Sequence, residues 1–167
     1  MDVGITSTVP SEVLFAAGHR PADLNNLFIS SVAPPPEDLI ADAERRGLSP
    51  NLCSWVKGLY AYGLSGRLKC IVVASGGDCS DMAALADLWE EAGVEVVPFD
   101  FPYRRDAEAL RRELESFCDA FGTDMPEAEA VREDMLPLRT SLSRLDRLTW
   151  EWGAVSGGDN HRWLVSS

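Results

Sequence analysis

The sequence predicts an α/β domain in which a mostly parallel sheet lies between two layers of helices. Short apolar segments alternate along the chain with longer segments whose apolar residues recur at helical spacing. Residues 70–74 are apolar on both faces, which is typical of a central parallel strand covered by helices. Proline or glycine stands beside several helix ends, where each is favoured. We therefore expect a three-layer domain of the Rossmann-like or flavodoxin-like type.

The first half of the chain is expected to hold two strands and three helices. Residues 3–6 form a short apolar strand, and Pro10 and Gly18 stand at the two ends of the helix that follows. The apolar residues 27–30 are expected to form the second strand. The helices are expected at 11–17, 37–46 and 53–64.

The second half begins at the apolar strand and continues as alternating helices and strands. Residues 94–97 form the last strand, and Gly122 ends the helix that follows it. A long charged helix comes next, which Pro137 is expected to kink. Residues 156–165 resemble a turn that enters a further helix. The helices of this half are expected at 80–92, 106–121 and 126–152.

Length and composition limit the classes of protein to consider. The chain has 167 residues, of which 46% are hydrophobic, so it fits one ordinary domain. Residues 1–124 are expected to form the α/β domain, and residues 125–167 a helical linker to a second domain that this chain lacks. No apolar run approaches the roughly 20 residues that span a bilayer. The start shows no basic segment followed by an apolar one, so we expect a cytoplasmic protein with no membrane partner.

The formal net charge of -12 argues against a nucleic-acid partner, because the average field repels phosphates. A local basic patch could still bind an anion. The candidates are Arg104 with Arg105, Arg111 with Arg112, and Lys57. The alternative is that these are ordinary solvated charges.

Two of the four cysteines stand where a helix is expected to begin. Cys53 precedes one helix, and Cys79 follows a strand and a Gly-Gly turn before another. A helix amino terminus stabilises negative charge and so favours the thiolate, which is the form that binds metal. These thiols could therefore hold an iron–sulfur cluster. The alternatives are two buried small residues or a redox or nucleophilic cysteine, and Cys70 and Cys118 are expected to lie in the core.

Ser7, Thr8 and Glu12 come just after the first predicted strand. Hydroxyls and a carboxylate at the carboxyl end of a parallel strand could bind a substrate or move a proton. The alternative is that Ser7 or Thr8 caps the next helix, with Glu12 favoured by the helix dipole. The segment 75–78 (SGGD) has neither GxGxxG spacing nor a Walker pattern, and its glycines are expected to let the backbone approach a bound group.

Five segments, in this order, resemble the 2-hydroxyacyl-CoA dehydratase family, in particular subunits similar to the 2-hydroxyglutaryl-CoA dehydratase D-component. They are residues 9–21 (VPSEVLFAAGHRP), 52–54 (LCS), 74–81 (ASGGDCSD), 88–89 (LW) and 155–157 (VSG). The resemblance implies an amino-terminal domain of this family, with a [4Fe-4S] cluster held by Cys53 and Cys79 and by a third cysteine of the missing domain. Ser7 and Glu12 match a serine and a glutamate of the family and become candidate catalytic residues.

The resemblance also implies an activity. Family members are lyases that remove water from (R)-2-hydroxyacyl-CoA to give 2-enoyl-CoA. An ATP-dependent activator protein injects one electron, and a ketyl radical makes the β-proton removable. A homologous second subunit and an anaerobic source are further implications, and this fragment alone is expected to be inactive.

Three departures from the family pattern stand out: the glycine-rich turn before Cys79, Ser11 in place of an acid, and the absent third ligand. The alternatives that remain open are a double-cubane-cluster or benzoyl-CoA reductase-type reductase, and a cluster-free α/β binding module.

Overall fold

The computed structural model describes residues 1–74, 76 and 79–166. The chain divides into two compact units, Met1–Ala128 and Glu129–Ser167, which are described separately. In the described part of the chain, no helix combines the length and hydrophobicity needed to cross a bilayer.

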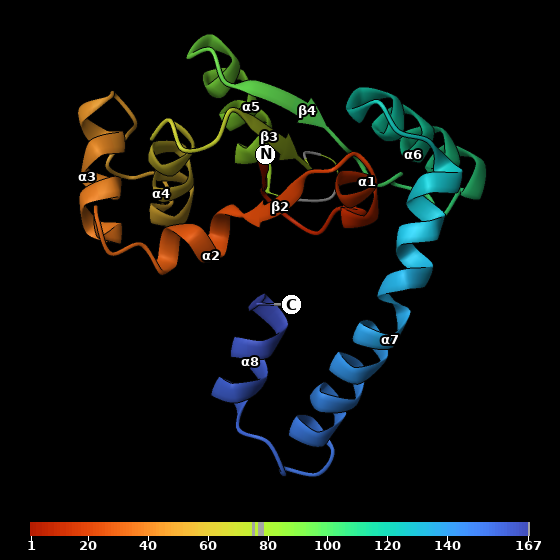
Figure 1. Cartoon of the computed structure of the whole chain (residues 1–167). Helices are drawn as coiled ribbons and strands as arrows, with labels where there is room; N and C mark the ends of the chain where they lie inside the picture. The colour runs from red at the N-terminus through yellow and green to blue at the C-terminus, as the bar shows by residue number, and fades with distance from the viewer. Residues whose placement is uncertain (75, 77–78, 167) are drawn as a thin grey trace. The chain divides into compact units, whose positions relative to one another are not determined.

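The first unit is built on a sheet of four parallel strands, in the order β2-β1-β3-β4 (Figure 1). The register places Gly4 opposite Ile71, and Val72 opposite Val97. This arrangement confirms the predicted α/β class with a parallel sheet. The strands are β1 (Asp2–Ile5), β2 (Arg20–Asp23), β3 (Cys70–Val73) and β4 (Glu95–Pro98).

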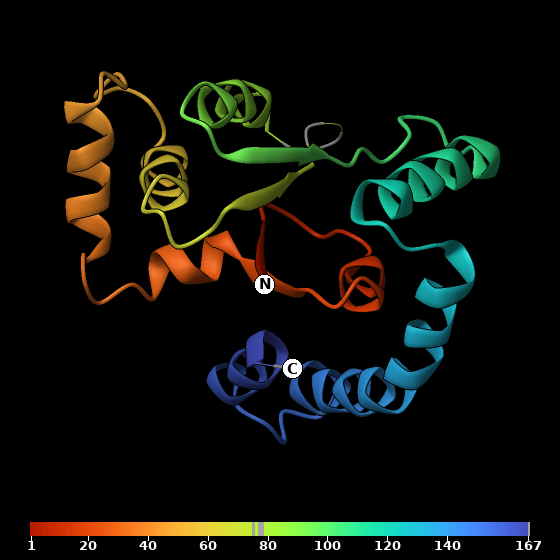
Figure 2. The ribbon, with the colours of Figure 1, turned by 45° about the horizontal axis from the view of Figure 1, so that its top comes forward.

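Helices cover both faces of this sheet, as the apolar run at 70–74 predicted. Side chains alternate along a strand, so Ile71 and Val73 pack in one core and Cys70 and Val72 in the other. Helices α2, α3, α4 and α5 contribute to the first core, and α1 and α6 to the second (Figure 2). The bounds are α1 (Ser11–Ala16), α2 (Leu24–Ile29), α3 (Pro36–Arg45), α4 (Ser54–Gly63), α5 (Asp81–Glu91) and α6 (Ala107–Phe121).

The predicted strand at 27–30 is wrong, because this segment lies in helix α2 and the second strand comes earlier, at Arg20–Asp23. Asp23 accepts a hydrogen bond from the backbone N–H of Asn25 at 2.9 Å and so caps the helix. Leu24 and Phe28, four residues apart, are both buried. A short apolar run does not distinguish a strand from one face of a helix, and the cap decided the outcome here.

The second unit contains most of α7 (Met125–Trp150) and all of α8 (Gly157–Ser166). These confirm the long helix and the further helix that the sequence predicts, and α7 continues through Pro137. The amide of Asn160 donates a hydrogen bond to Asp146 at 3.0 Å and joins the two helices.

Candidate functional site

The carboxyl edge of the sheet has its topological switch point between β1 and β3. Helix α1 leaves β1 towards one face, and α5 leaves β3 towards the other. Thr6 joins the two strand ends, because its backbone N–H donates to the Val72 carbonyl at 3.2 Å and its Oγ1 accepts from the Ala74 N–H at 3.3 Å. Parallel sheets bind ligands at such a point.

A polar hollow of about 400 Å³ opens at the carboxyl ends of β1 and β2. Ser7 lines it, in the place where the sequence puts a candidate catalytic hydroxyl. The other lining residues are Ile5, Thr6, Thr8, Asp23 and Asn25.

Asn25 is a residue of this hollow that the sequence analysis missed. Its amide donates to the Thr6 carbonyl and to Asp23 Oδ1, both at 2.9 Å, and its Oδ1 accepts from Trp55 Nε1 at 2.6 Å. Asn25 therefore connects the end of β1 to the first turn of α4. Only the helix-capping pattern around Asp23 could have drawn attention to it.

Cys53 is the residue that precedes α4, and its side chain is exposed. Its carbonyl accepts a hydrogen bond from the Lys57 backbone N–H at 3.1 Å. Lys57 itself is buried and pairs with Glu44 at 2.5 Å and with the Pro50 carbonyl at 3.1 Å. The expectation that Lys57 could belong to a basic surface patch that binds an anion is therefore wrong. The contacts of Lys57 instead hold the segment that leads to Cys53.

Cys79 lies just before α5 and is also exposed. Its carbonyl accepts from the Met82 N–H at 2.9 Å. Helices α4 and α5 both run from the carboxyl edge of the sheet back to its amino edge, because each leads directly into a strand. They pack side by side on one face, where Trp89 Nε1 donates to the Tyr60 carbonyl at 3.2 Å (Figure 2).

The fold therefore brings the two exposed thiols to the same edge of the sheet, each at a helix amino terminus. Such positions suit thiolate ligands. Among residues 1–74, 76 and 79–166, no group of three His, Cys, Asp or Glu side chains is arranged to hold a metal ion. This edge thus carries two exposed thiols, Cys53 and Cys79, and two thiols alone do not complete the ligand set of an iron–sulfur cluster.

Glu12 lies half-buried in the first turn of α1, close in sequence to Ser7. The residue at the N-cap position of this helix is Pro10, which makes no capping hydrogen bond through its side chain. The alternative in which Ser7 or Thr8 caps α1 is therefore wrong. The reason is that Thr6 and Ser7 lie in a bend after β1, and the chain enters the helix only after the proline.

The other two cysteines lie in the core, as predicted. Burial raises the pKa of the Cys70 thiol to about 11, with a smaller contribution from Glu95. Burial also raises the pKa of the Cys118 thiol. Both therefore favour the neutral thiol, which is a poor metal ligand.

In the glycine-rich turn before Cys79, Ser75, Gly77 and Asp78 lie outside the described residues. Gly76 donates its N–H to Asp100 Oδ1 at 2.5 Å, and a Cβ added at Gly76 would lie 3.0 Å from the Asp100 side chain. The group close to Gly76 is thus the side chain of Asp100, which comes just after β4. The expectation that the glycines admit a bound group stays a prediction.

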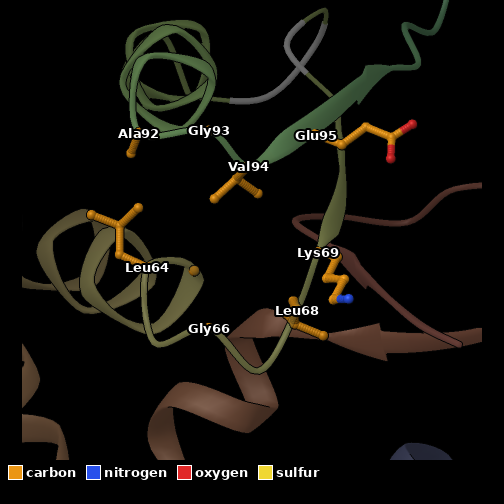
Figure 3. Close-up of a pocket in the computed structure, with 9 residues that line it drawn as sticks. Leu64, Gly66, Leu68, Lys69, Ala92, Gly93, Val94 and Glu95 are labelled. Atoms are coloured by element: carbon orange, nitrogen blue, oxygen red, sulfur yellow. The ribbon is translucent and has the colours of Figure 1, made fainter.

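A second hollow lies at the opposite edge of the sheet, where α4 and α5 end (Figure 3). Leu64 and Val94 point towards one another across it, while Lys69 and Glu95 extend away. It holds none of the predicted site residues and faces the carbonyl ends of the two helices. We therefore place the candidate site at the carboxyl edge.

Comparison with known proteins gives a family match. No curated protein matches the chain. A family model described as 2-hydroxyglutaryl-CoA dehydratase, D-component, matches residues 6–133 and so includes Ser7, Glu12, Cys53 and Cys79. The chain belongs to the 2-hydroxyglutaryl-CoA dehydratase D-component family.

Proposed function

We propose that this chain is part of an iron–sulfur (R)-2-hydroxyacyl-CoA dehydratase, in which Cys53 and Cys79 are ligands of a [4Fe-4S] cluster. One observation supports this above all others. Two exposed thiols of a chain from this family lie at the amino ends of neighbouring helices, at the switch-point edge of a parallel sheet.

The donor chemistry of this edge fits part of such a cluster. Thiolates are the ligands that iron–sulfur clusters use, and the other two cysteines are buried in the core. The third sulfur ligand comes from a second domain, to which residues 125–167 lead.

The cluster, when bound, supplies one-electron chemistry, with the electron delivered by an ATP-dependent activator protein. The reaction is the removal of water from the acyl-CoA by a ketyl-radical route, with a homologous subunit completing the enzyme. Ser7 offers a hydroxyl at the end of β1 that can hydrogen-bond to the substrate. Glu12, on the next helix, is a carboxylate able to accept a proton.

Iron and acid-labile sulfide, measured on the full-length gene product purified without oxygen, test this proposal. Cys53→Ser and Cys79→Ser are expected to lose both elements. Cys118→Ala is the matched control, since it removes a buried thiol of the same domain and is expected to keep them. Absence of iron in the unsubstituted protein, even after reconstitution, would instead support a cluster-free binding module.

A second assay separates a dehydratase from a related reductase. It measures the dehydration of (R)-2-hydroxyacyl-CoA in the presence of activator and ATP.

A further inference from the structure

Arg104 and Arg105 are two adjacent, exposed guanidinium groups on the loop between β4 and α6. Neither has an ion-pair partner among the residues that the structure describes. Arg111 and Arg112, one to two turns into α6, differ in this respect. They pair with Glu115 at 4.0 Å and with Glu108 at 3.5 Å. In a chain of net charge -12, two adjacent arginines without a described acidic partner concentrate positive charge on this loop.

Aromatic side chains stand next to these cations. Tyr103 is fully exposed, and Phe101 is 46% exposed while its ring packs edge-on against Phe99 at 5.1 Å. A fully exposed tyrosine offers both faces of its ring for stacking. Adjacent guanidiniums and an open aromatic face together suit a ligand that carries phosphates and a flat ring.

The acidic side chains around this loop bind the protein's own backbone. The carboxylate of Asp100 accepts from the Gly76 N–H at 2.5 Å. Asp106 caps α6 by accepting from two backbone N–H groups, at 3.0 and 3.2 Å, and its own N–H donates to the Arg104 carbonyl at 2.7 Å. These contacts fix both ends of the loop and turn the two carboxylates towards amides.

The loop also lies at the edge that carries the candidate site. It follows the carboxyl end of β4, and β4 pairs with β3, which precedes Cys79. Gly76, in the turn between β3 and Cys79, is the residue bonded to Asp100. A ligand that extended from the sheet edge to this loop would therefore have its phosphates at Arg104 and Arg105.

We propose that Tyr103, Arg104 and Arg105 bind the phosphorylated adenosine of an acyl-CoA, with phosphates on the two guanidiniums and the adenine ring against Tyr103. The identification of this ligand as an acyl-CoA rests on the proposed function. Free adenine nucleotides share the same chemistry but lack the 3′-phosphate of coenzyme A. Because the 3′-phosphate adds negative charge, two adjacent guanidiniums are expected to bind coenzyme A more tightly than free adenine nucleotides.

Calorimetric titration of the full-length protein with coenzyme A, dephospho-coenzyme A and ADP tests this assignment. The key variant is Arg104→Gln with Arg105→Gln. Arg111→Gln with Arg112→Gln is its control, because it removes the same charge from paired arginines nearby. The first pair is expected to raise the Kd for coenzyme A about tenfold or more, and the control less than about twofold. Tyr103→Ala is expected to weaken binding, and Tyr103→Phe to preserve it, since the ring face is what stacks.

Coenzyme A is expected to bind more tightly than the two ligands that lack the 3′-phosphate. Failure of coenzyme A to bind, or equal losses in the two double variants, would refute the site. Equal affinity for coenzyme A and ADP would assign the loop to free nucleotides and overturn the proposal. The titration does not require the cluster, so it is repeated on protein from which the iron has been removed. The Kd for coenzyme A is expected to be unchanged there, which keeps this test separate from the test for the cluster.

Discussion

The ion pair between Lys57 and Glu44 joins two side chains of very different exposure. Removing Glu44 is therefore expected to lower the free energy of unfolding by a different amount than removing Lys57. Lys57 lies on α4 with 3% of its side chain exposed, and Glu44 lies on α3 with 36% exposed. Glu44→Met leaves a buried ammonium without its counter-charge. Lys57→Met leaves a carboxylate that water can reach. We therefore expect Glu44→Met to be the more destabilising substitution.

The expected magnitudes follow from these exposures. Removing one partner of a buried pair costs about 3–5 kcal/mol. Because water reaches part of Glu44, we expect Glu44→Met to lower the free energy of unfolding by about 2–3 kcal/mol. Lys57→Met keeps most of the buried apolar stem and loses only a half-solvated pair, so we expect about 1 kcal/mol. In the double variant no buried charge remains, and its stability is expected to resemble that of Lys57→Met.

Urea unfolding followed by tryptophan fluorescence measures these differences at neutral pH. Asp42→Asn is the control, because it breaks two surface pairs, with Arg46 at 2.7 Å and with Arg45 at 3.2 Å, and is expected to cost about 1 kcal/mol or less. Equal losses for Glu44→Met and Lys57→Met would refute the reasoning from burial. So would a double variant less stable than Glu44→Met alone.

Three further substitutions test a buried thiol, a close packing contact and a bridging amide in the first unit. The pKa of Cys70 is raised from 9.0 to about 11 in the folded protein, so stability is full below about pH 9 and is expected to fall by about 2–3 kcal/mol as the pH rises to 11. Cys70→Ala is expected to remove the Cys70 part of this alkaline decline, measured by urea unfolding across that pH range, while the buried Cys118 keeps its own smaller contribution. Gly58→Ala is expected to cost about 1–3 kcal/mol, because its Cβ would overlap the buried Phe28 ring, and its melting temperature reports the loss. Asn25→Ala is expected to cost about 1–3 kcal/mol and to shift the Trp55 emission, because three hydrogen bonds disappear.

Each of these has an outcome that contradicts it. An unchanged alkaline decline in Cys70→Ala would assign that decline to other groups. Gly158→Ala, whose added Cβ would have no neighbour closer than 3.9 Å, is the control for Gly58, and equal effects would contradict the overlap with Phe28. Asn51→Ala, an exposed asparagine, is the control for Asn25, and equal losses would show that the three hydrogen bonds contribute little.

Local patterns in the sequence predicted most of the elements, because each depends on residues close together in the chain. The apolar run at 70–74 indicated a central strand, and the structure places it between β1 and β4. Cys53 and Cys79 were expected at helix starts, and both precede helices. The segment 27–30 was misassigned, because its apolar residues fit a strand and one helix face equally well.

The sequence by itself determined the α/β class, the covered central strand, the buried positions of Cys70 and Cys118 and the family. Only the tertiary structure decided which strands are neighbours. The strand order in turn places the two exposed thiols at the same edge of the sheet. It also decided that Lys57 is buried against Glu44 and that Asn25 bridges β1 and α4. Helical periodicity and helix caps depend on residues a few positions apart, so a sequence pattern reveals them. Strand order, ion pairs and bridging amides join residues that are far apart in the chain. Such residues come into contact only when the helices pack on the two faces of the sheet.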